Sequence, residues 1–191
     1  MPFVGEWNNS TLMVRAFVAL ELSDEIRAQL GAAQEMLKQC NARMTWVEPE
    51  NIHITVKFLD DVDNEKIPHV KSALASIAFK PFSVKAGAIT VNNPRRPFTV
   101  WCALEDGGQG SQLLRLVEDA LSPLGFSREG RRFTPHATIA RVKRFDPSLF
   151  KALNAISTST YGDCLITGMK LKESTLTPQG PVYEDLLEVV W

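Results

Sequence analysis

The sequence predicts an α+β fold in which antiparallel sheet carries helices on its outer side. Stretches with helical spacing of apolar residues alternate with stretches in which apolar and polar residues alternate singly, so both element types are expected. Several predicted strands follow one another without a helix between them, which favours antiparallel sheets. A glycine-rich break at residues 107–110 divides the pattern into two similar halves. This repetition predicts two pseudo-symmetric, intertwined lobes around a central groove.

Residues 13–78 are expected to hold three strands and two helices. The first helix follows Ser23, a favoured N-cap residue, and has an apolar stripe that runs from Ile26 to Leu37. Pro49 interrupts the chain before the next strand begins at His53. The expected strands are 15–20, 44–47 and 53–59, and the expected helices are 24–37 and 64–78.

Two more strands follow before the glycine-rich break, and after it the pattern is repeated. A helical stripe covers 113–124 and ends at Gly125, and a further helix begins near Asp146-Pro147, where proline suits the first turn. The expected strands are 82–91, 98–104, 135–142, 163–174 and 182–190. Residues 1–12 show no clear period and are interpreted as an N-terminal extension or artefact. The domain itself is therefore expected to span 13–191.

Composition narrows the class of protein. The chain has 191 residues, of which 45% are hydrophobic and 23% charged, as in an ordinary globular protein. A net charge of −1 means that any nucleic-acid contact must come from local basic clusters. The three cysteines are far apart and suggest neither a zinc site nor a disulfide framework. With no membrane-spanning run and no signal peptide, we expect a cytoplasmic monomer without cofactor or metal.

A repeated four-residue pattern carries the candidate chemistry. Two of the three histidines begin it, in the runs His53-Ile54-Thr55-Val56 and His136-Ala137-Thr138-Ile139. Strand alternation places each histidine and its threonine on one face and the aliphatic residues on the other. If the two halves face each other, two imidazoles and two hydroxyls meet in one site.

Such a site suits the opening of a cyclic phosphodiester. One imidazole activates water and the other protonates the leaving ribose oxygen, which is possible because histidine titrates near neutral pH. Threonine hydroxyls bind the phosphate oxygens, and no metal ion is required. A single strand histidine is more often a structural hydrogen-bonding residue, but the repeat favours catalysis for this pair. His69, which lacks the threonine, is interpreted as a surface residue.

Further residues are candidates for substrate binding. Lys57 shares the predicted face of His53, although a solvated lysine is the simpler interpretation. The others are basic residues in predicted loops and one aromatic residue before the second motif, with solvation and core packing as the respective alternatives. They are Arg131, Arg132, Arg95, Arg96 and Phe133. Alternation places Arg141 on the face opposite His136, which favours a structural ion pair there.

The sequence around both motifs resembles a known family. The stretch from Trp46 to Leu59 and the stretch from Phe133 to Arg141 are similar to the two-histidine (2H) phosphoesterase superfamily, specifically the LigT-like (ThpR) RNA 2′,3′-cyclic phosphodiesterases, or 2′-5′ RNA ligases. The resemblance covers residues 13–191 and implies a bilobal fold with the motifs facing across a groove. It also implies that His53 is the proton donor, that His136 is the proton acceptor and that the product is a 2′-phosphate.

The expected function is therefore hydrolysis of 2′,3′-cyclic phosphates on RNA ends or on small cyclic nucleotides. Two alternatives stay open on the sequence. The same residues suit the reverse reaction, which joins a cyclic phosphate to a 5′-hydroxyl in a 2′-5′ linkage. A non-catalytic RNA- or nucleotide-binding module would also use the motifs to hold phosphate, although binding alone does not need two titrating groups.

Overall fold

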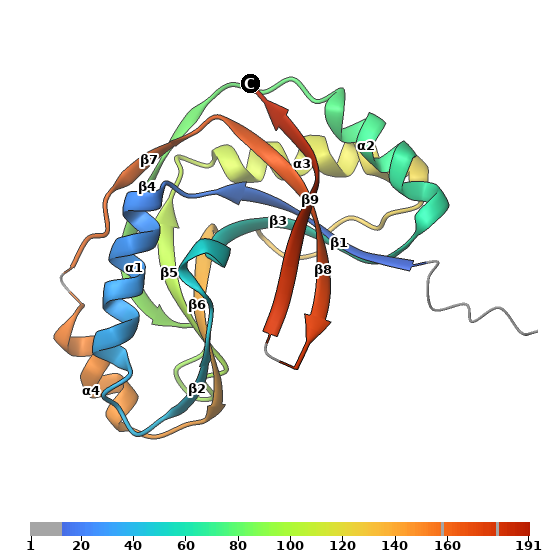
Figure 1. Ribbon diagram of the computed structural model, residues 1–191. Coiled ribbons are helices and arrows are strands. Elements are labelled where there is room, and N and C mark those ends of the chain that lie inside the picture. The colour runs from blue at the N-terminus through green and yellow to red at the C-terminus, as the bar shows by residue number, and fades with distance from the viewer. Residues whose placement is uncertain (1–12, 158, 179) are drawn as a thin grey trace, which may run out of the picture.

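A single curled sheet organises the protein. The computed structural model describes residues 13–157, 159–178 and 180–191, and within them nine strands pair in antiparallel fashion (Figure 1). Along the sheet the order is β7-β4-β5-β6-β3-β1-β8-β9, and β2 also pairs with β6. The strands are β1 (Met13–Glu21), β2 (Arg43–Trp46), β3 (His53–Asp63), β4 (Phe82–Val91), β5 (Thr99–Glu105), β6 (His136–Arg144), β7 (Asp163–Ile166), β8 (Gly168–Thr177) and β9 (Gly180–Val190).

Strands β3 and β6 meet at the centre of the sheet, where Ile54 pairs with Ala137. On one side of this seam lie β1, β8 and β9, and on the other lie β5, β4 and β7. The predicted α+β class with two related halves is confirmed, but the predicted boundary at residues 107–110 is wrong. Strands β4 and β5 precede this break and yet belong with β6, because the two halves are interleaved along the chain.

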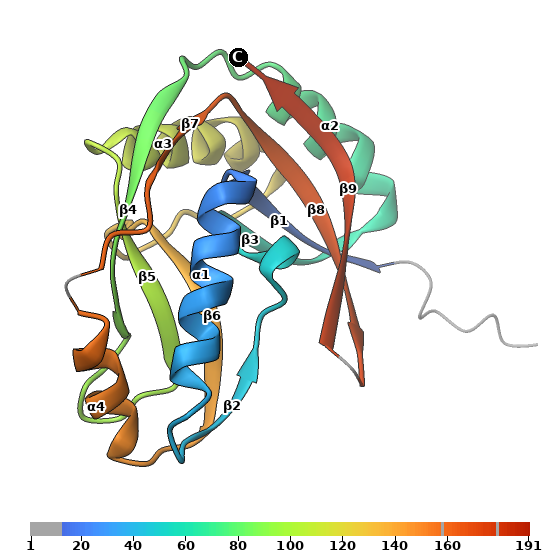
Figure 2. The same ribbon diagram turned by 60° about the vertical axis from the view of Figure 1, so that its left-hand side comes forward.

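The helices lie on the outer face of the curled sheet. They are α1 (Asp24–Leu37), α2 (Ile67–Ala75), α3 (Gln109–Leu121) and α4 (Ser148–Ala155). Helices α1 and α4 pack together, with α1 against β6, whereas α2 and α3 pack together, with α3 against β3 (Figures 1 and 2). The opposite, concave face lies between β6 and the β8–β9 hairpin. No helix of the described residues is long and apolar enough to cross a membrane.

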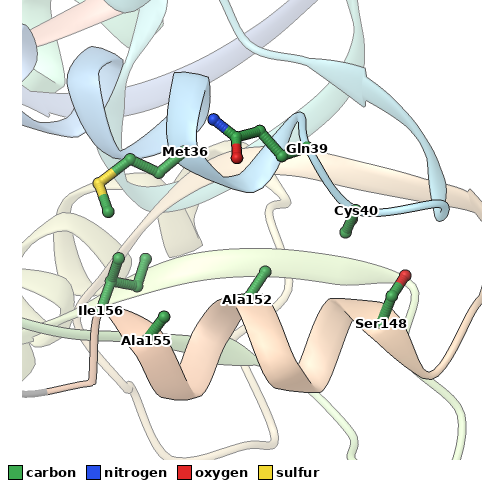
Figure 3. Close-up of a pocket in the computed structure, with 7 residues that line it drawn as sticks. All are labelled: Met36, Gln39, Cys40, Ser148, Ala152, Ala155 and Ile156. Atoms are coloured by element: carbon green, nitrogen blue, oxygen red, sulfur yellow. The ribbon is translucent and has the colours of Figure 1, made fainter.

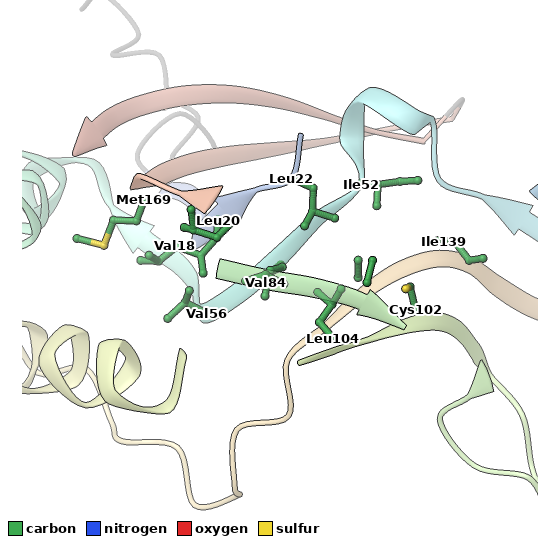
Figure 4. Packing of buried hydrophobic residues seen from close by; sticks show 14 of the residues in the cluster. Val18, Leu20, Leu22, Ile52, Val56, Val84, Cys102, Leu104, Ile139 and Met169 are labelled. Carbon is green, nitrogen blue, oxygen red and sulfur yellow. The ribbon is translucent and has the colours of Figure 1, made fainter. Parts of the chain in front are cut away.

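The hydrophobic core fills the space between sheet and helices. Val18, Val56 and Ile139, from β1, β3 and β6, belong to one buried cluster that continues across both halves (Figure 4). Burying an aliphatic side chain of this size stabilises a fold by about 1.5–3 kcal/mol. The two central strands are thus fixed from behind, which leaves their other face to carry polar residues.

The observed ends of the helices match the predicted ends where a capping residue determines them. The Ser23 hydroxyl accepts a 3.4 Å hydrogen bond from the Ile26 amide, so α1 begins at its predicted cap. Helix α2 is shorter than the predicted 64–78, because residues 64–66 form a 3₁₀ turn before it. Gly125, with φ of +90°, ends the segment after α3 as expected.

The predicted strand 163–174 is wrong, because the structure divides it into two. β7 pairs with β4, whereas β8 pairs with β1 and β9, near the other end of the sheet. The chain changes place at Thr167 and Gly168. A Cβ atom on Gly168 would clash with the Val189 carbonyl oxygen, so only glycine allows this close passage. Alternation continues on both sides of the glycine, and the sequence pattern therefore hides the break.

Candidate active site

His53 and His136 are the first residues of the two central strands. The antiparallel pair Ile54–Ala137 sets the register, so His53 and Thr138 lie next to this pair on one side of it, and Thr55 and His136 on the other. All four side chains therefore lie on the concave face, as the repeat predicted. In such a ladder, opposite Cβ atoms are about 4.5–5.5 Å apart and diagonal neighbours about 7–8 Å. The two histidines are diagonal neighbours, a separation that suits one phosphate group between them.

Each imidazole is oriented by the backbone two residues before it. Nδ1 of His53 lies 2.7 Å from the Asn51 carbonyl oxygen, and Nδ1 of His136 lies 2.7 Å from that of Thr134. A carbonyl oxygen only accepts hydrogen bonds, so Nδ1 carries the proton in both rings. In each neutral ring Nε2 then has the free lone pair. The Nε2 atom of His53 lies 3.1 Å from the Thr55 hydroxyl.

The two rings differ in their surroundings. His53 stacks on Phe17 with ring centroids 5.0 Å apart and meets the edge of Tyr183 at 5.5 Å. His136 packs against Trp101 at 4.2 Å. Burial lowers the pKa of His53 to about 4, against the effect of its bond to the Asn51 carbonyl. His53 is therefore a neutral imidazole near pH 7 in the free protein.

A network of ion pairs lies beside His53 and joins residues of β1, α1, β8 and β9. Glu21, directly opposite His53 in the ladder, pairs with Arg27 and with Lys172 at 2.8 Å. Lys172 also bonds Asp185 at 2.6 Å. The positive charges of Lys172 and Arg27 contribute to the low pKa of His53. This network holds β1, β8 and β9 around the histidine while disfavouring its protonated form.

Lys57 is not on the histidine face, so the prediction from alternation is wrong. In the pairing with β1, Val56 is an extra residue, because Ala19 pairs with Thr55 and Val18 with Lys57. This bulge reverses the alternation. Lys57 is buried on the core side, where its Nζ donates to the Ser127 carbonyl oxygen at 2.7 Å and lies 3.7 Å from Glu118.

A second bulge brings Arg141 to the histidine face, where alternation had excluded it. Ile139 is the extra residue, since Thr138 pairs with Trp101 and Ala140 with Val100. Both Ile139 and Ala140 are fully buried, and Arg141 is exposed. Among the described residues no carboxylate lies within 4.0 Å of the Arg141 guanidinium. The predicted structural ion pair is therefore not formed, and Arg141 is free to meet an anion.

Comparison with known proteins agrees with this geometry. The model of the family described as LigT like Phosphoesterase matches residues 20–101 and 105–183. The chain belongs to this family. Its relatives include proteins named RNA 2′,3′-cyclic phosphodiesterase from Archaeoglobus fulgidus, 35% identical over 91% of this chain and 98% of the relative, and from Methanothermobacter thermautotrophicus, 33% identical over 92% and 97%.

Solved structures share the fold of this LigT-like protein. The crystal structure of TT0787 of Thermus thermophilus superposes with a TM-score of 0.78 at 24% identity, covering 92% of this chain and 97% of that one. E. coli LigT complexed with 3′-AMP superposes with a TM-score of 0.74 at 21% identity, covering 94% and 98%. At these identities the likeness concerns the fold alone.

The remaining candidates of the LigT-like chain lie away from the histidines or at loops. The ring of Phe133 packs so closely on Gly110 that a Cβ atom there would overlap it, so Phe133 helps to anchor the start of α3. Arg131 and Arg132 are exposed in the loop before β6. Arg95 is exposed in the β4–β5 loop, which joins the Arg141 end of the sheet where the Val142 amide donates to the Phe98 carbonyl oxygen.

A separate pocket of about 250 Å³ lies between α1 and α4 (Figure 3). Its lining includes Met36, Cys40 and Ile156, with the Ser148 hydroxyl at one end, and it contains neither motif. It brings no acid–base pair together. Among the described residues, no group of three or more His, Cys, Asp or Glu side chains is arranged to hold a metal ion.

Proposed function

We propose that the protein hydrolyses RNA 2′,3′-cyclic phosphates to 2′-phosphomonoesters. The observation that carries this proposal is the placement of His53 and His136 as diagonal neighbours on one face, each with a threonine beside it and each with Nδ1 bonded to a carbonyl oxygen. This chain covers almost the whole length of relatives that are named RNA 2′,3′-cyclic phosphodiesterase, which supports RNA 2′,3′-cyclic phosphates as the substrate class here.

In the proposed reaction the cyclic phosphate lies between the two imidazoles. Nε2 of His136 accepts a proton from a water molecule, whose oxygen forms the new bond to phosphorus. The bond from phosphorus to the ribose 3′-oxygen breaks, and His53 donates the proton that this oxygen takes up. The phosphate stays on the 2′-oxygen. Each histidine then holds the opposite protonation state, and exchange with solvent restores the pair.

His53 acquires its proton only with an anion beside it. Burial and neighbouring cations keep the free imidazole neutral, as its low pKa indicates. The negative charge of a bound phosphodiester counteracts these cations and raises the pKa of His53. The protonated donor is thus formed in the complex, where it is needed.

The polar residues beside the histidines hold the phosphate in place. Thr55 and Thr138 donate from their hydroxyls to the non-bridging oxygens, and Arg141 supplies a positive charge on the same face. The guanidinium also stabilises the additional negative charge that develops as water attacks. This role for Arg141 depends on the β6 bulge and has no counterpart in the sequence prediction.

The proposal is tested by hydrolysis of a 2′,3′-cyclic mononucleotide. His53→Ala and His136→Ala are each expected to lower kcat at least 100-fold, since a positioned acid or base contributes about 10²–10⁴-fold. His69→Ala is the control, because this exposed residue on α2 lies outside both motifs. Circular dichroism checks that each variant is folded. Near-normal turnover by either motif variant, or loss of activity in EDTA, would contradict the mechanism.

A further inference from the structure

We propose that Arg43 and Arg144, together with Arg141, form a binding track for the phosphates of an RNA chain that leads to the histidines. The proposal rests on the proposed function and adds a second contact, to the RNA chain that precedes the cyclic phosphate. Arg43 is the first residue of β2, and Arg144 is the last residue of β6.

The strand register places the track on the histidine face. Met44 pairs with Val142, and both side chains pack against the hydrophobic core. Their neighbours on the other side of the sheet are therefore Arg43 and Arg141. Arg144 pairs directly with Arg43, because the ladder skips Lys143 as an extra residue. All three arginines are exposed, and the register assigns them to the same face of the sheet.

The Arg43–Arg144 pair is unfavourable in the isolated protein. Like charges directly opposite each other in an antiparallel ladder destabilise it, by an energy similar to the gain from an opposite-charge pair. Across the described ranges, no carboxylate lies within 4.0 Å of either guanidinium. The carboxylate of Asp146 accepts from the Ser148 hydroxyl at 2.6 Å and from the Ser148 amide at 2.9 Å, which lowers its pKa, and it is near enough for the charge of Arg144 to help lower that pKa. Two adjacent cations with no direct ion-pair partner in the described part of the chain are suited to bind an external anion.

The length of the track indicates a polymer. At about 3.3 Å per strand residue, and with one extra bulge residue in each interval, Arg141 lies roughly 7 Å beyond Thr138, and Arg144 roughly 7 Å further. A stacked strand rises about 3.4 Å along its axis for each nucleotide, so a span of this size covers several nucleotides. A 2′,3′-cyclic phosphate ends an RNA at its 3′ side. The chain on the track is therefore the 5′ portion of the same RNA.

The test compares an RNA hexamer that ends in a 2′,3′-cyclic phosphate with a cyclic mononucleotide. The double variant Arg43→Gln/Arg144→Gln is measured beside a control of equal charge change, Lys80→Gln/Arg115→Gln. Both control residues are exposed, and Arg115 lies on α3 behind the sheet. Kd is measured for the hexamer with the 2′-phosphate product end, so that turnover does not interfere, at 50 mM and 200 mM salt.

The salt dependence gives the decisive readout. Each phosphate contact to single-stranded nucleic acid contributes about 0.7 to the slope of log K against log salt, so losing two lowers the slope by about 1.4. The rise in hexamer Kd between the two salt concentrations is then about sevenfold smaller for the track variant than for wild type. Turnover of the cyclic mononucleotide and the behaviour of the control stay at the wild-type level.

Three outcomes separate this inference from the function on which it rests. Equal salt slopes for wild type and the Arg43→Gln/Arg144→Gln variant would overturn the track while leaving hydrolysis intact. If the salt slope of hexamer binding fell equally in the track variant and in the charge-matched control, the effect would be one of net charge, and the track would be overturned. A wild-type protein that hydrolyses neither substrate would overturn the proposed function itself. Arg43→Lys/Arg144→Lys, which keeps both charges, is expected to retain most of the slope.

Discussion

The side-chain amide of Gln34 on α1 donates a 2.8 Å hydrogen bond to the carbonyl oxygen of Ile139, the extra residue of the β6 bulge. The same nitrogen also donates to the Val47 carbonyl oxygen at 2.7 Å. Gln34 is buried, and its two acceptors belong to the strand that carries His136 and to the segment after β2. A core residue on the outer side of the sheet thus supports the distortion that brings Arg141 to the inner side.

Replacing Gln34 by leucine is therefore expected to impair both stability and activity. Two carbonyl oxygens lose a buried donor, which costs about 2 kcal/mol in the free energy of unfolding. The Ile139 carbonyl oxygen then keeps, within the described residues, only the Val47 amide as a donor, at 3.0 Å, so the bulge is less firmly held and kcat/KM for a cyclic mononucleotide also falls. Urea unfolding and steady-state kinetics measure the two effects. The exposed Gln29→Leu on the same helix is the control, and an active Gln34→Leu enzyme would argue against the link to Arg141.

Arg141 gives a prediction of its own. Arg141→Gln removes the positive charge beside the phosphate and is expected to lower kcat/KM about 100-fold, in the range found for single donors that stabilise a developing anion. Arg141→Lys retains the charge and recovers part of the activity. The free energy of unfolding changes by less than about 0.5 kcal/mol, because the residue is exposed and has no ion-pair partner. A glutamine variant with wild-type kinetics would place the phosphate elsewhere.

The ionisation of His53 is expected to depend on ligand. NMR titration of the free protein should find its pKa near 4, below the usual value of 6.5, because the ring is buried. Addition of a 2′-phosphonucleotide should raise this pKa. A His53 resonance that titrates near 6.5 with or without ligand would contradict the proposed proton donor.

The same pKa predicts a loss of stability in mild acid. Between pH 6.5 and about 4 the unfolded chain binds a proton on this histidine and the folded protein does not. The contribution of His53 to stability is therefore complete above pH 6.5 and falls as the pH approaches 4, by on the order of 3 kcal/mol. His53→Gln removes this part of the acid sensitivity, as urea unfolding at several pH values would measure.

A substitution of Lys57 tests whether its side chain lies on the histidine face, as alternation predicted, or on the core side, as in the structure. Lys57→Met leaves the buried Glu118 without its cationic partner and is expected to cost about 3 kcal/mol in stability. KM for a cyclic mononucleotide stays unchanged in the folded variant, because Lys57 lies on the far side of the sheet from the histidines. The exposed Lys66→Met is the stability control. A raised KM with normal stability would instead support Lys57 as a phosphate-binding residue, the candidate role that the sequence offered beside a solvated lysine.

Much of the fold and the centre of the site follow from periodicity and from the repeated motif. Histidine and threonine are separated by one residue, so alternation places them correctly wherever the strand is regular. It fails at Lys57 and Arg141, each of which follows an inserted bulge residue. A bulge depends on pairing partners far away in the sequence, such as Val18 for Lys57, and leaves no local signal. For the same reason the division of residues 163–174 between two strands is visible only in three dimensions.

The interleaving of the two halves also has a consequence for synthesis of the chain. Strand β8 pairs with β1, and β9, which carries Tyr183, pairs with β8. Phe17 and His53 are made early, yet the ring of Tyr183 that packs against both belongs to the last strand. A nascent chain therefore holds both histidine motifs before it can enclose His53 with Tyr183 or form the ion pairs of Lys172. The burial and the Lys172 charge that lower the pKa of His53 are therefore complete only after β8 and β9 have been made and have joined β1.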